Sequence, residues 1–295
     1  MKQNEIKKKL KESGYYANKE ICFAVAAAEM GIPIIVTGAP GTGKTSLAYA
    51  TAKAFDLPLI RIQFYEGLTD DKILYDYNYQ KQLLTLEAIK PMLEKAYGNE
   101  EDIGTILRKA SEDINFYGEE FLIERPVLKA INGDGRKVLL LDEIDKADEA
   151  IEYTLLEVLD DYSMSIPQFG RIECPADQRP IVFLTSNESR NLSDALKRRC
   201  GYLKIEDKSK SELEEIIITK AAVDFRLAEK ISECIVRARN YELNQMPSIA
   251  EGIQWGMFLK ENYSKEAAKG SLGLLVKNAR DKELIKPVVD NVFSN

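Results

Sequence analysis

The feature that most constrains the fold of this chain is a glycine-rich loop at residues 38–45, with the sequence GAPGTGKT. The loop matches the pattern G-x-x-x-x-G-K-S/T in full, follows an apolar run at 32–36 and precedes a helical pattern that ends at Phe55. Between a buried strand and a helix, such a loop wraps phosphates with its backbone N–H groups, and the helix dipole favours the anion. We therefore expect Lys44 on the β- and γ-phosphates of a bound nucleotide and the Thr45 hydroxyl on its Mg²⁺. The candidate nucleotide-binding residues are Gly38, Ala39, Pro40, Gly41, Thr42, Gly43, Lys44, Thr45 and Ser46.

A pair of acidic residues follows another apolar run. Val138–Leu141 reads as a buried strand, and Asp142 and Glu143 come directly after it. Ligands of open α/β sheets bind beyond the carboxyl ends of the strands, so we expect these carboxylates beside the phosphate loop. Asp142 would order the Mg²⁺ shell, and Glu143 would act as the general base on the attacking water. The pair predicts ATP hydrolysis rather than transfer to a separate acceptor; ordinary strand-end acids that cap a helix are the alternative.

Two weaker signals complete the candidate site. Asn187 follows a further apolar run, Ile181–Thr185. If that strand lies between the loop strand and the acidic strand, Asn187 could orient the water or the γ-phosphate, although asparagine is also common in turns. Arg198 and Arg199 end a predicted helix, where basic residues are favourable in any case. Their functional interpretation is an arginine finger that reaches the γ-phosphate of a neighbouring subunit.

Composition limits the chemistry and the partners of the chain. It contains no histidine, which excludes histidine-based triads, imidazole general bases and histidine-ligated metals. With 41 basic and 48 acidic residues the formal net charge is −7, which argues against nucleic acid as a partner. The four cysteines are scattered, and no apolar run is long enough for a membrane span. These features predict a reduced, cytoplasmic protein.

The alternation of strand and helix patterns stops near residue 206. Before it, apolar runs at 32–36, 57–64, 138–141 and 181–185 alternate with helical patterns, which predicts an α/β fold with a central parallel sheet flanked by helices. After it only helical patterns remain, so we predict a core at 1–206 and a small all-α lid at 207–295. Within the core, the Asp- and Tyr-rich stretch 65–82 reads as an irregular insertion and 163–174 as a β-hairpin. Further helical patterns lie at roughly 83–97, 102–113 and 126–132.

Six stretches outside the generic motifs are more specific. They are YEGLT at 65–69, LYDYNY at 74–79, FLIERPVLKA at 121–130, DEIDKAD at 142–148, LSDALKRRC at 192–200 and PSIAEGIQW at 247–255. In these stretches the chain resembles the MoxR family of AAA+ ATPases, and most of all the branch involved in carbon monoxide dehydrogenase maturation. The resemblance covers nearly the whole chain.

The resemblance implies an ATPase that uses ATP and Mg²⁺, forms a ring, commonly a hexamer, and acts as a molecular chaperone. Its client would be an enzyme that it remodels or matures, metalloenzymes included, together with a von Willebrand factor A-domain protein. By the same resemblance Asn187 is the sensor-1 residue, Arg199 is the finger with Arg198 as the fallback, and the insertion and hairpin face the ring pore or partner proteins.

One position departs from the family pattern. MoxR proteins carry a sensor-2 arginine within a Pro-Ser-x-Arg stretch, and Ala250 occupies that place here. Two other functions stay open at this point. One is a DNA-directed AAA+ motor, and the other is an assembly module that binds ATP with negligible hydrolysis.

Overall fold

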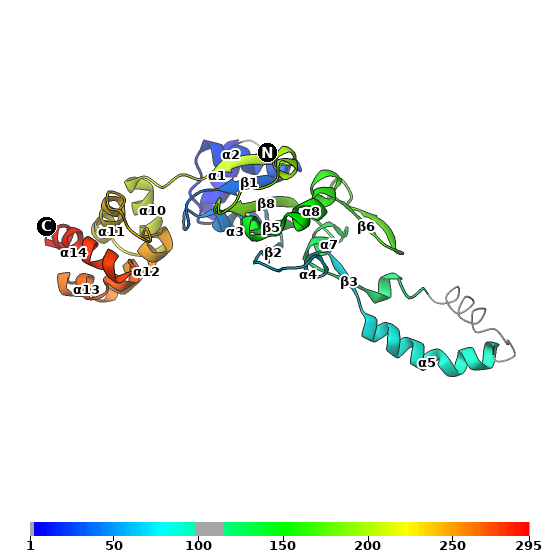
Figure 1. Cartoon of the computed structure of the whole chain (residues 1–295). Helices are drawn as coiled ribbons and strands as arrows, with labels where there is room; N and C mark the ends of the chain where they lie inside the picture. Colours follow the sequence, from blue (N-terminus) through cyan, green and yellow to red (C-terminus); the bar gives the residue numbers. More distant parts are fainter. Residues whose placement is uncertain (1–2, 98–114, 295) are drawn as a thin grey trace.

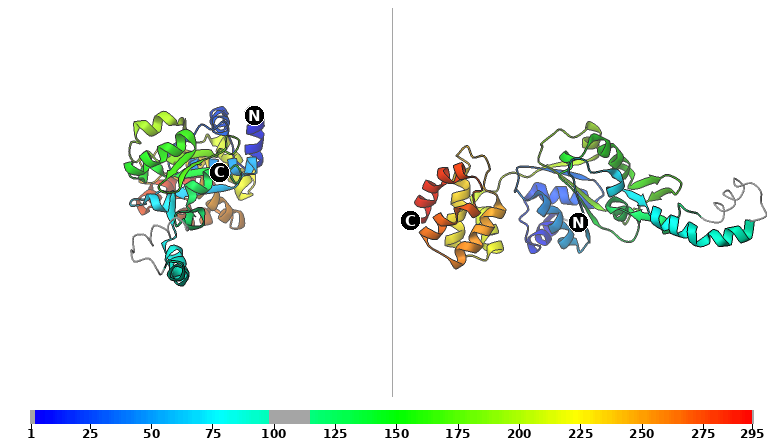
Figure 2. Two further views of the ribbon diagram at one scale, coloured as in Figure 1. Left: turned by 90° about the vertical axis from the view of Figure 1, so that its right-hand side faces the viewer. Right: turned by 60° about the horizontal axis from the view of Figure 1, so that its bottom comes forward.

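The computed structural model describes residues 3–97 and 115–294. The chain forms three parts in a row: an α/β core lies between a helical C-terminal part and the projecting helix α5 (Tyr79–Tyr97) (Figure 1 and Figure 2). The helical pattern expected at 102–113 lies outside the described residues. Within the described ranges, no helix is long and apolar enough to cross a membrane.

The core is built on a five-stranded parallel sheet with the order β2-β5-β8-β1-β9. Its strands are β1 (Ile34–Thr37), β2 (Leu59–Gln63), β5 (Val138–Asp142), β8 (Ile181–Ser186) and β9 (Gly201–Lys204). The predicted α/β fold with a central parallel sheet is confirmed, and β8 does lie between β1 and β5. The edge strand β9 was not predicted, because only Leu203 of its four residues is buried and no apolar run marks it.

The sheet is buried on both faces, which explains the continuous apolar runs of its strands. Val138 and Leu140 of β5 belong to one hydrophobic core, and Leu139 and Leu141 belong to a second on the opposite face. The first face is covered by α1 (Gln3–Glu12), α2 (Lys19–Glu29) and α3 (Lys44–Phe55). The second is covered by α7 (Pro126–Ile131), the short 3-10 helix η2 (Ile144–Lys146), α8 (Glu149–Asp161) and α9 (Asp194–Arg199).

The stretch predicted to be irregular at 65–82 is more regular than expected. It contains α4 (Asp70–Ile73) and β3 (Tyr75–Tyr77), and α5 already begins at Tyr79. The reason is non-local, because β3 is paired antiparallel with β4 (Leu122–Glu124), which follows η1 (Glu119–Phe121). In the segment expected to form a hairpin, β6 (Ser163–Ile166) and β7 (Gly170–Glu173) are paired antiparallel.

Residues 207–294, which we call the lid, are helical. The lid contains α10 (Lys210–Ala221), α11 (Phe225–Ala238), α12 (Ile249–Glu261), α13 (Lys265–Gly270), η3 (Leu272–Leu274) and α14 (Ala279–Ser294). Capping boxes begin α10 at Ser209 and α12 at Ser248. The lid has its own core around the fully buried Trp255, whose indole N–H donates to Ser271 Oγ at 2.9 Å. The proposed domain boundary at residue 206 falls between β9 and α10.

Candidate functional site

The glycine-rich loop joins β1 to α3, as the sequence motif predicts. Gly43 is the N-cap residue of α3 and has φ +98°, a left-handed conformation that glycine adopts without strain. The Lys44 ammonium lies inside the loop, where it donates to the carbonyl oxygens of Gly38 at 2.7 Å and Ala39 at 3.0 Å. Burial lowers the pKa of Lys44, and the nearby carboxylates of Asp145 and Asp142 oppose that shift. The loop therefore places the Lys44 cation beside the N-terminus of helix α3.

A cavity of about 710 Å³ lies beside this loop, between the core and the lid. Its volume is within the range of roughly 300–1,000 Å³ that is usual for small-molecule sites. Among its core residues are Lys44, Asp142 and Asn187, which the sequence predicted. The lid contributes residues that sequence reasoning missed, including Ile216 and Lys208. No local motif marks these positions, because they approach the loop only through the tertiary fold.

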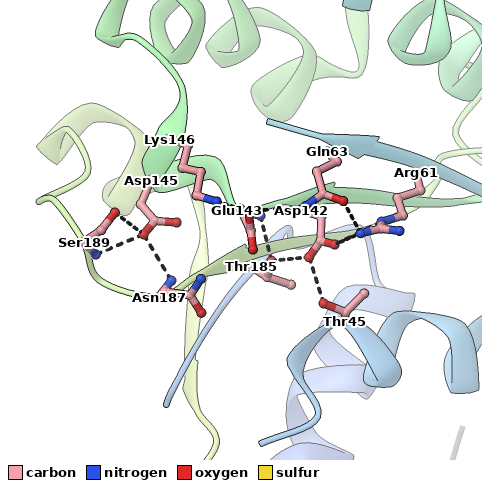
Figure 3. A network of polar contacts seen from close by, with 10 residues as sticks. All are labelled: Thr45, Arg61, Gln63, Asp142, Glu143, Asp145, Lys146, Thr185, Asn187 and Ser189. Atoms are coloured by element: carbon pink, nitrogen blue, oxygen red, sulfur yellow. Dashed lines mark hydrogen bonds and ion pairs between the residues drawn. The ribbon is translucent and has the colours of Figure 1, made fainter. Parts of the chain in front are cut away.

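The carboxylate of Asp142 is the centre of a polar network at the end of β5 (Figure 3). One oxygen, Oδ1, accepts hydrogen bonds from the hydroxyls of Thr45 at 2.9 Å and Thr185 at 2.6 Å. The other, Oδ2, accepts from Arg61 Nε at 3.0 Å and from Arg61 Nη2 at 2.7 Å. Asp142 is only 2% exposed. The four hydrogen bonds to its two oxygens offset the cost of burying the charge. The sequence marked Thr185 only as a polar residue at a strand end and gave it no role, and it did not indicate Arg61 as part of the site.

Glu143 turns away from Asp142 because its backbone is left-handed, with φ +59°. Its backbone N–H donates to Thr185 Oγ1 at 2.9 Å. Its carboxylate oxygen Oε2 lies 2.5 Å from Lys146 Nζ and 3.3 Å from Gln63 Nε2. A non-glycine residue in this conformation carries strain, which is typical of residues held for function. The two acids thus have different partners: Asp142 contacts Thr45 of the loop and Arg61, whereas Glu143 contacts Lys146 and Gln63.

Asn187 is positioned by the buried carboxylate of Asp145. Asp145 Oδ2 accepts from the backbone N–H groups of Asn187 at 3.2 Å and Ser189 at 3.0 Å, and from Ser189 Oγ at 2.6 Å. Burial alone would raise the pKa of Asp145, but these hydrogen bonds hold it below its usual value. The half-buried Asn187 lines the cavity on the same side as Lys44 and Asp142. The structure therefore brings together Lys44, Thr45, Asp142, Glu143 and Asn187.

Comparison with known proteins agrees with this arrangement of loop, acids and sheet. Residues 33–200 match the profile of the family described as "AAA domain (dynein-related subfamily)", which covers more than half of the chain. The chain belongs to this family.

The similar solved structures include RuvB from Thermotoga maritima. The Holliday junction branch migration motor shares 17% identity over 92% of this chain and 67% of that chain, with a TM-score of 0.40. A RuvB mutant shares 18% identity over 98% of this chain and 70% of that chain, with a TM-score of 0.44. These values describe a distant likeness of fold and nothing else. No curated protein matched the chain.

The oxygen atoms at the centre of the AAA domain fit a magnesium ion. Thr45 Oγ1 and Asp142 Oδ1 lie 2.9 Å apart beside the phosphate loop. Mg²⁺ prefers oxygen ligands and is usually held by one or two carboxylates together with substrate phosphates and waters. Within 3–97 and 115–294, no group of three or more Cys, Asp or Glu side chains could hold a metal ion by itself. Thr45 and Asp142 are therefore the residues that would hold the ion.

Arg198 and Arg199 do not line the cavity of their own AAA domain. They end α9, where Arg199 Nε lies 3.2 Å from Asp160 Oδ2 of α8 and Arg199 Nη1 donates to Ala195 O at 3.2 Å. Arg198 is exposed, and its side chain makes no hydrogen bond or ion pair with any residue that the structure describes. Neither arginine can serve the cavity of its own subunit without a rearrangement.

Proposed function

We propose that this AAA domain protein is an ATP-hydrolysing, ring-forming molecular chaperone. The observation that carries the proposed hydrolysis is the placement of Asp142 and Glu143. Asp142 faces Thr45 of the phosphate loop, Glu143 lines the same cavity, and Asn187 lies on the neighbouring strand end. A protein that only bound nucleotide would need the loop but not a second carboxylate directed at the cavity.

The proposed chemistry follows from the positions of these groups. Lys44 and the N–H groups at the start of α3 bind the β- and γ-phosphates. Thr45 and Asp142 hold Mg²⁺, which when bound neutralises charge on the phosphates. Glu143 accepts the proton of the attacking water, and Asn187 orients that water or the γ-phosphate. Because Glu143 Oε2 lies 2.5 Å from Lys146 Nζ, Lys146 must release this oxygen, or the water must use the other one.

Two substitutions test the assignment of these roles. Glu143→Gln keeps the size of the side chain but removes the base, so ATP binding should persist while turnover falls by about 100-fold or more. Lys44→Ala removes a phosphate contact and should weaken binding itself. Phosphate release and the Kd of ATP, measured on the same preparations, separate the two effects. Normal hydrolysis by Glu143→Gln would show that Glu143 is not the base.

In the proposed ring, each subunit supplies an arginine to the γ-phosphate bound by its neighbour. We propose Arg199 as that finger, with Arg198 as the fallback, on the strength of the resemblance described above. The ion pair with Asp160 holds Arg199 within its own subunit, so assembly would have to exchange Asp160 for the neighbour's phosphate. Loss of the finger should reduce turnover by about 1,000-fold. Adding Arg199→Ala or Arg198→Ala subunits to wild type should lower the specific activity; unchanged activity in both mixtures would exclude a finger acting between subunits.

The partners are proposed from the sequence resemblance alone. They are an enzyme client, metalloenzymes included, and a von Willebrand factor A-domain protein that acts with a cytoplasmic hexamer. The formal net charge of −7 supports a protein rather than DNA as the client. Capture of client proteins by the Glu143→Gln variant, which should hold ATP without turnover, tests this. If DNA instead stimulated hydrolysis in a salt-dependent manner, the protein would be a DNA-directed motor.

A further inference from the structure

Arg61 of strand β2 contacts the metal-ordering carboxylate from outside the recognised motifs. Two of its nitrogens, Nε and Nη2, donate to the single oxygen Oδ2 of Asp142 at 3.0 and 2.7 Å (Figure 3). The Asp142 side chain is only 3% exposed, whereas that of Arg61 is 38% exposed. Charge-assisted hydrogen bonds of this kind fix geometry as well as supplying energy.

The guanidinium gives the two oxygens of Asp142 different surroundings. Oδ2 is taken up by Arg61, and Oδ1 is left facing the hydroxyls of Thr45 and Thr185. A carboxylate that was free to rotate about its terminal bond would exchange these oxygens. An arginine guanidinium stays protonated in proteins. Arg61 therefore remains a cation that selects which oxygen faces the phosphate loop.

Arg61 also acts on the second acid through Gln63. The two residues lie on the same face of β2, since side chains alternate along a strand. Arg61 Nη2 donates to Gln63 Oε1, so the other end of the amide, Nε2, points away and donates to Glu143 Oε2 at 3.3 Å. An amide whose oxygen is held by a guanidinium can present only its NH₂ group at the other end. One cation thus orients the contacts of both acids.

We propose that Arg61 is a positioning residue for ATP hydrolysis, which holds Asp142 toward Thr45 and aligns Glu143 through Gln63. The inference rests on the proposed ATPase function and deepens it. The two contacts of Arg61 should have effects that can be separated. Its contact with Asp142 affects binding of the magnesium-bound nucleotide, and its contact with Gln63 affects turnover alone.

The experiment compares four variants with wild type: Arg61→Gln, Arg61→Lys, Gln63→Leu and the control Arg237→Gln. Arg237 is also an arginine paired with a carboxylate, Glu233, but it lies within α11 of the lid. For each protein the Kd of ATP is measured with Mg²⁺ and with EDTA, together with kcat, KM and the thermal midpoint without nucleotide.

Arg61→Gln should lower kcat by about 10- to 100-fold, the range usual for residues that orient metal ligands. Its ATP affinity should fall with Mg²⁺ but not with EDTA, and its thermal midpoint should shift no more than that of Arg237→Gln. Arg61→Lys should recover only part of kcat, because an ammonium cannot make the forked contact. Gln63→Leu should lower kcat and leave the magnesium-dependent affinity unchanged.

Wild-type kcat in Arg61→Gln would overturn the proposal, and so would an equal loss of ATP affinity with Mg²⁺ and with EDTA. Both results are distinguishable from failure of the ATPase function itself. If wild type hydrolyses ATP and Glu143→Gln does not, a normal Arg61→Gln variant removes only the role of Arg61. If wild type hydrolyses no ATP under any assembly condition, the ATPase proposal fails and the role of Arg61 falls with it.

Discussion

The two walls of the cavity beside the glycine-rich loop are built differently. On the core wall, Asp142 accepts four hydrogen bonds, and behind this wall Asp145 accepts three, so both carboxylates are fixed before any ligand binds. On the lid wall, Ile216, Ala250 and Ile253 are small or apolar. The buried lid cation Lys208 is held loosely, with its Nζ 3.4 Å from Tyr16 O and 3.8 Å from Glu212 Oε1.

This difference indicates that the two walls have different roles. The core wall is preorganised for charge, which is what catalysis of phosphoryl transfer requires. The lid wall shapes the cavity and can close it, but it holds few fixed charges. Substitutions in the core wall should therefore change turnover and core stability, whereas substitutions in the lid wall should change how strongly closure depends on the nucleotide.

Among the tests of this difference between the walls, the largest expected effect comes from the point where the walls touch. Gly41 of the phosphate loop has φ +79°, and a Cβ added there would lie 2.3 Å from Ser248 Cβ at the N-cap of α12. Gly41→Ala should therefore strain the loop and push the lid away. Strain of this kind costs about 1–3 kcal/mol, so we expect ATP affinity, measured as Kd, to fall by about tenfold or more.

Gly67 provides the matched control for this substitution. Its φ is +81°, nearly that of Gly41, but a Cβ added there would meet nothing within 4 Å. Gly67→Ala should carry the backbone strain without any clash against the lid. Equal ATP affinities in the two variants would show that the contact between loop and lid has no part in binding.

The next effect concerns Asp145, which holds Asn187 of the core wall in place. Asp145→Asn replaces an acceptor of three hydrogen bonds with an amide, and should lower the free energy of unfolding by about 1–3 kcal/mol. It should also reduce turnover, because the backbone of Asn187 loses its anchor. The exposed Asp148, whose side chain makes no cap hydrogen bond, gives the control Asp148→Asn. Thermal unfolding and phosphate release are the measurements.

The same carboxylate predicts a pH dependence. The pKa of Asp145 is lower in the folded protein than its usual value. Its contribution to stability is therefore present above the unfolded pKa of about 3.9 and is lost as the pH falls through the lower folded pKa. The difference in thermal midpoint between wild type and Asp145→Asn should be full at pH 7 and should shrink below about pH 4. A difference that stayed constant into strong acid would contradict this assignment.

The residues of the core wall differ in how well the sequence predicts them. Lys44, Thr45, Asp142 and Glu143 belong to contiguous patterns in which an apolar run ends in a loop or in acids, and such patterns carry their own structural context. Arg61 has no such pattern. It reads as an ordinary polar residue of a strand, and it reaches Asp142, 81 residues away, only because β2 is paired with β5.

The lid wall and the edge of the sheet were harder to predict for the same reason. Ile216 and Lys208 lie in segments whose patterns indicate only a helix and its start. β9 has a single buried residue, and β3 depends on β4 for its partner. In each case the decisive contact joins distant segments, and no local periodicity reports it.

The smallest expected effect tests the lid wall at Ala250, where the resembled family has an arginine. Ala250 is exposed, lines the cavity and lies in the first turn of α12. Ala250→Arg would add a cation facing the phosphates, worth about 0.2–1 kcal/mol for a partly exposed pair. The positive end of the α12 dipole opposes that gain, so we expect affinity for ATP relative to ADP to rise only about two- to fivefold.

The control for this substitution is Ala250→Gln, which adds side-chain length without charge. Because the interaction is electrostatic, the gain in Ala250→Arg should shrink as salt is raised. Equal changes in ATP and ADP affinity would mean that the added charge does not sense the γ-phosphate, and that the lid wall contributes shape alone.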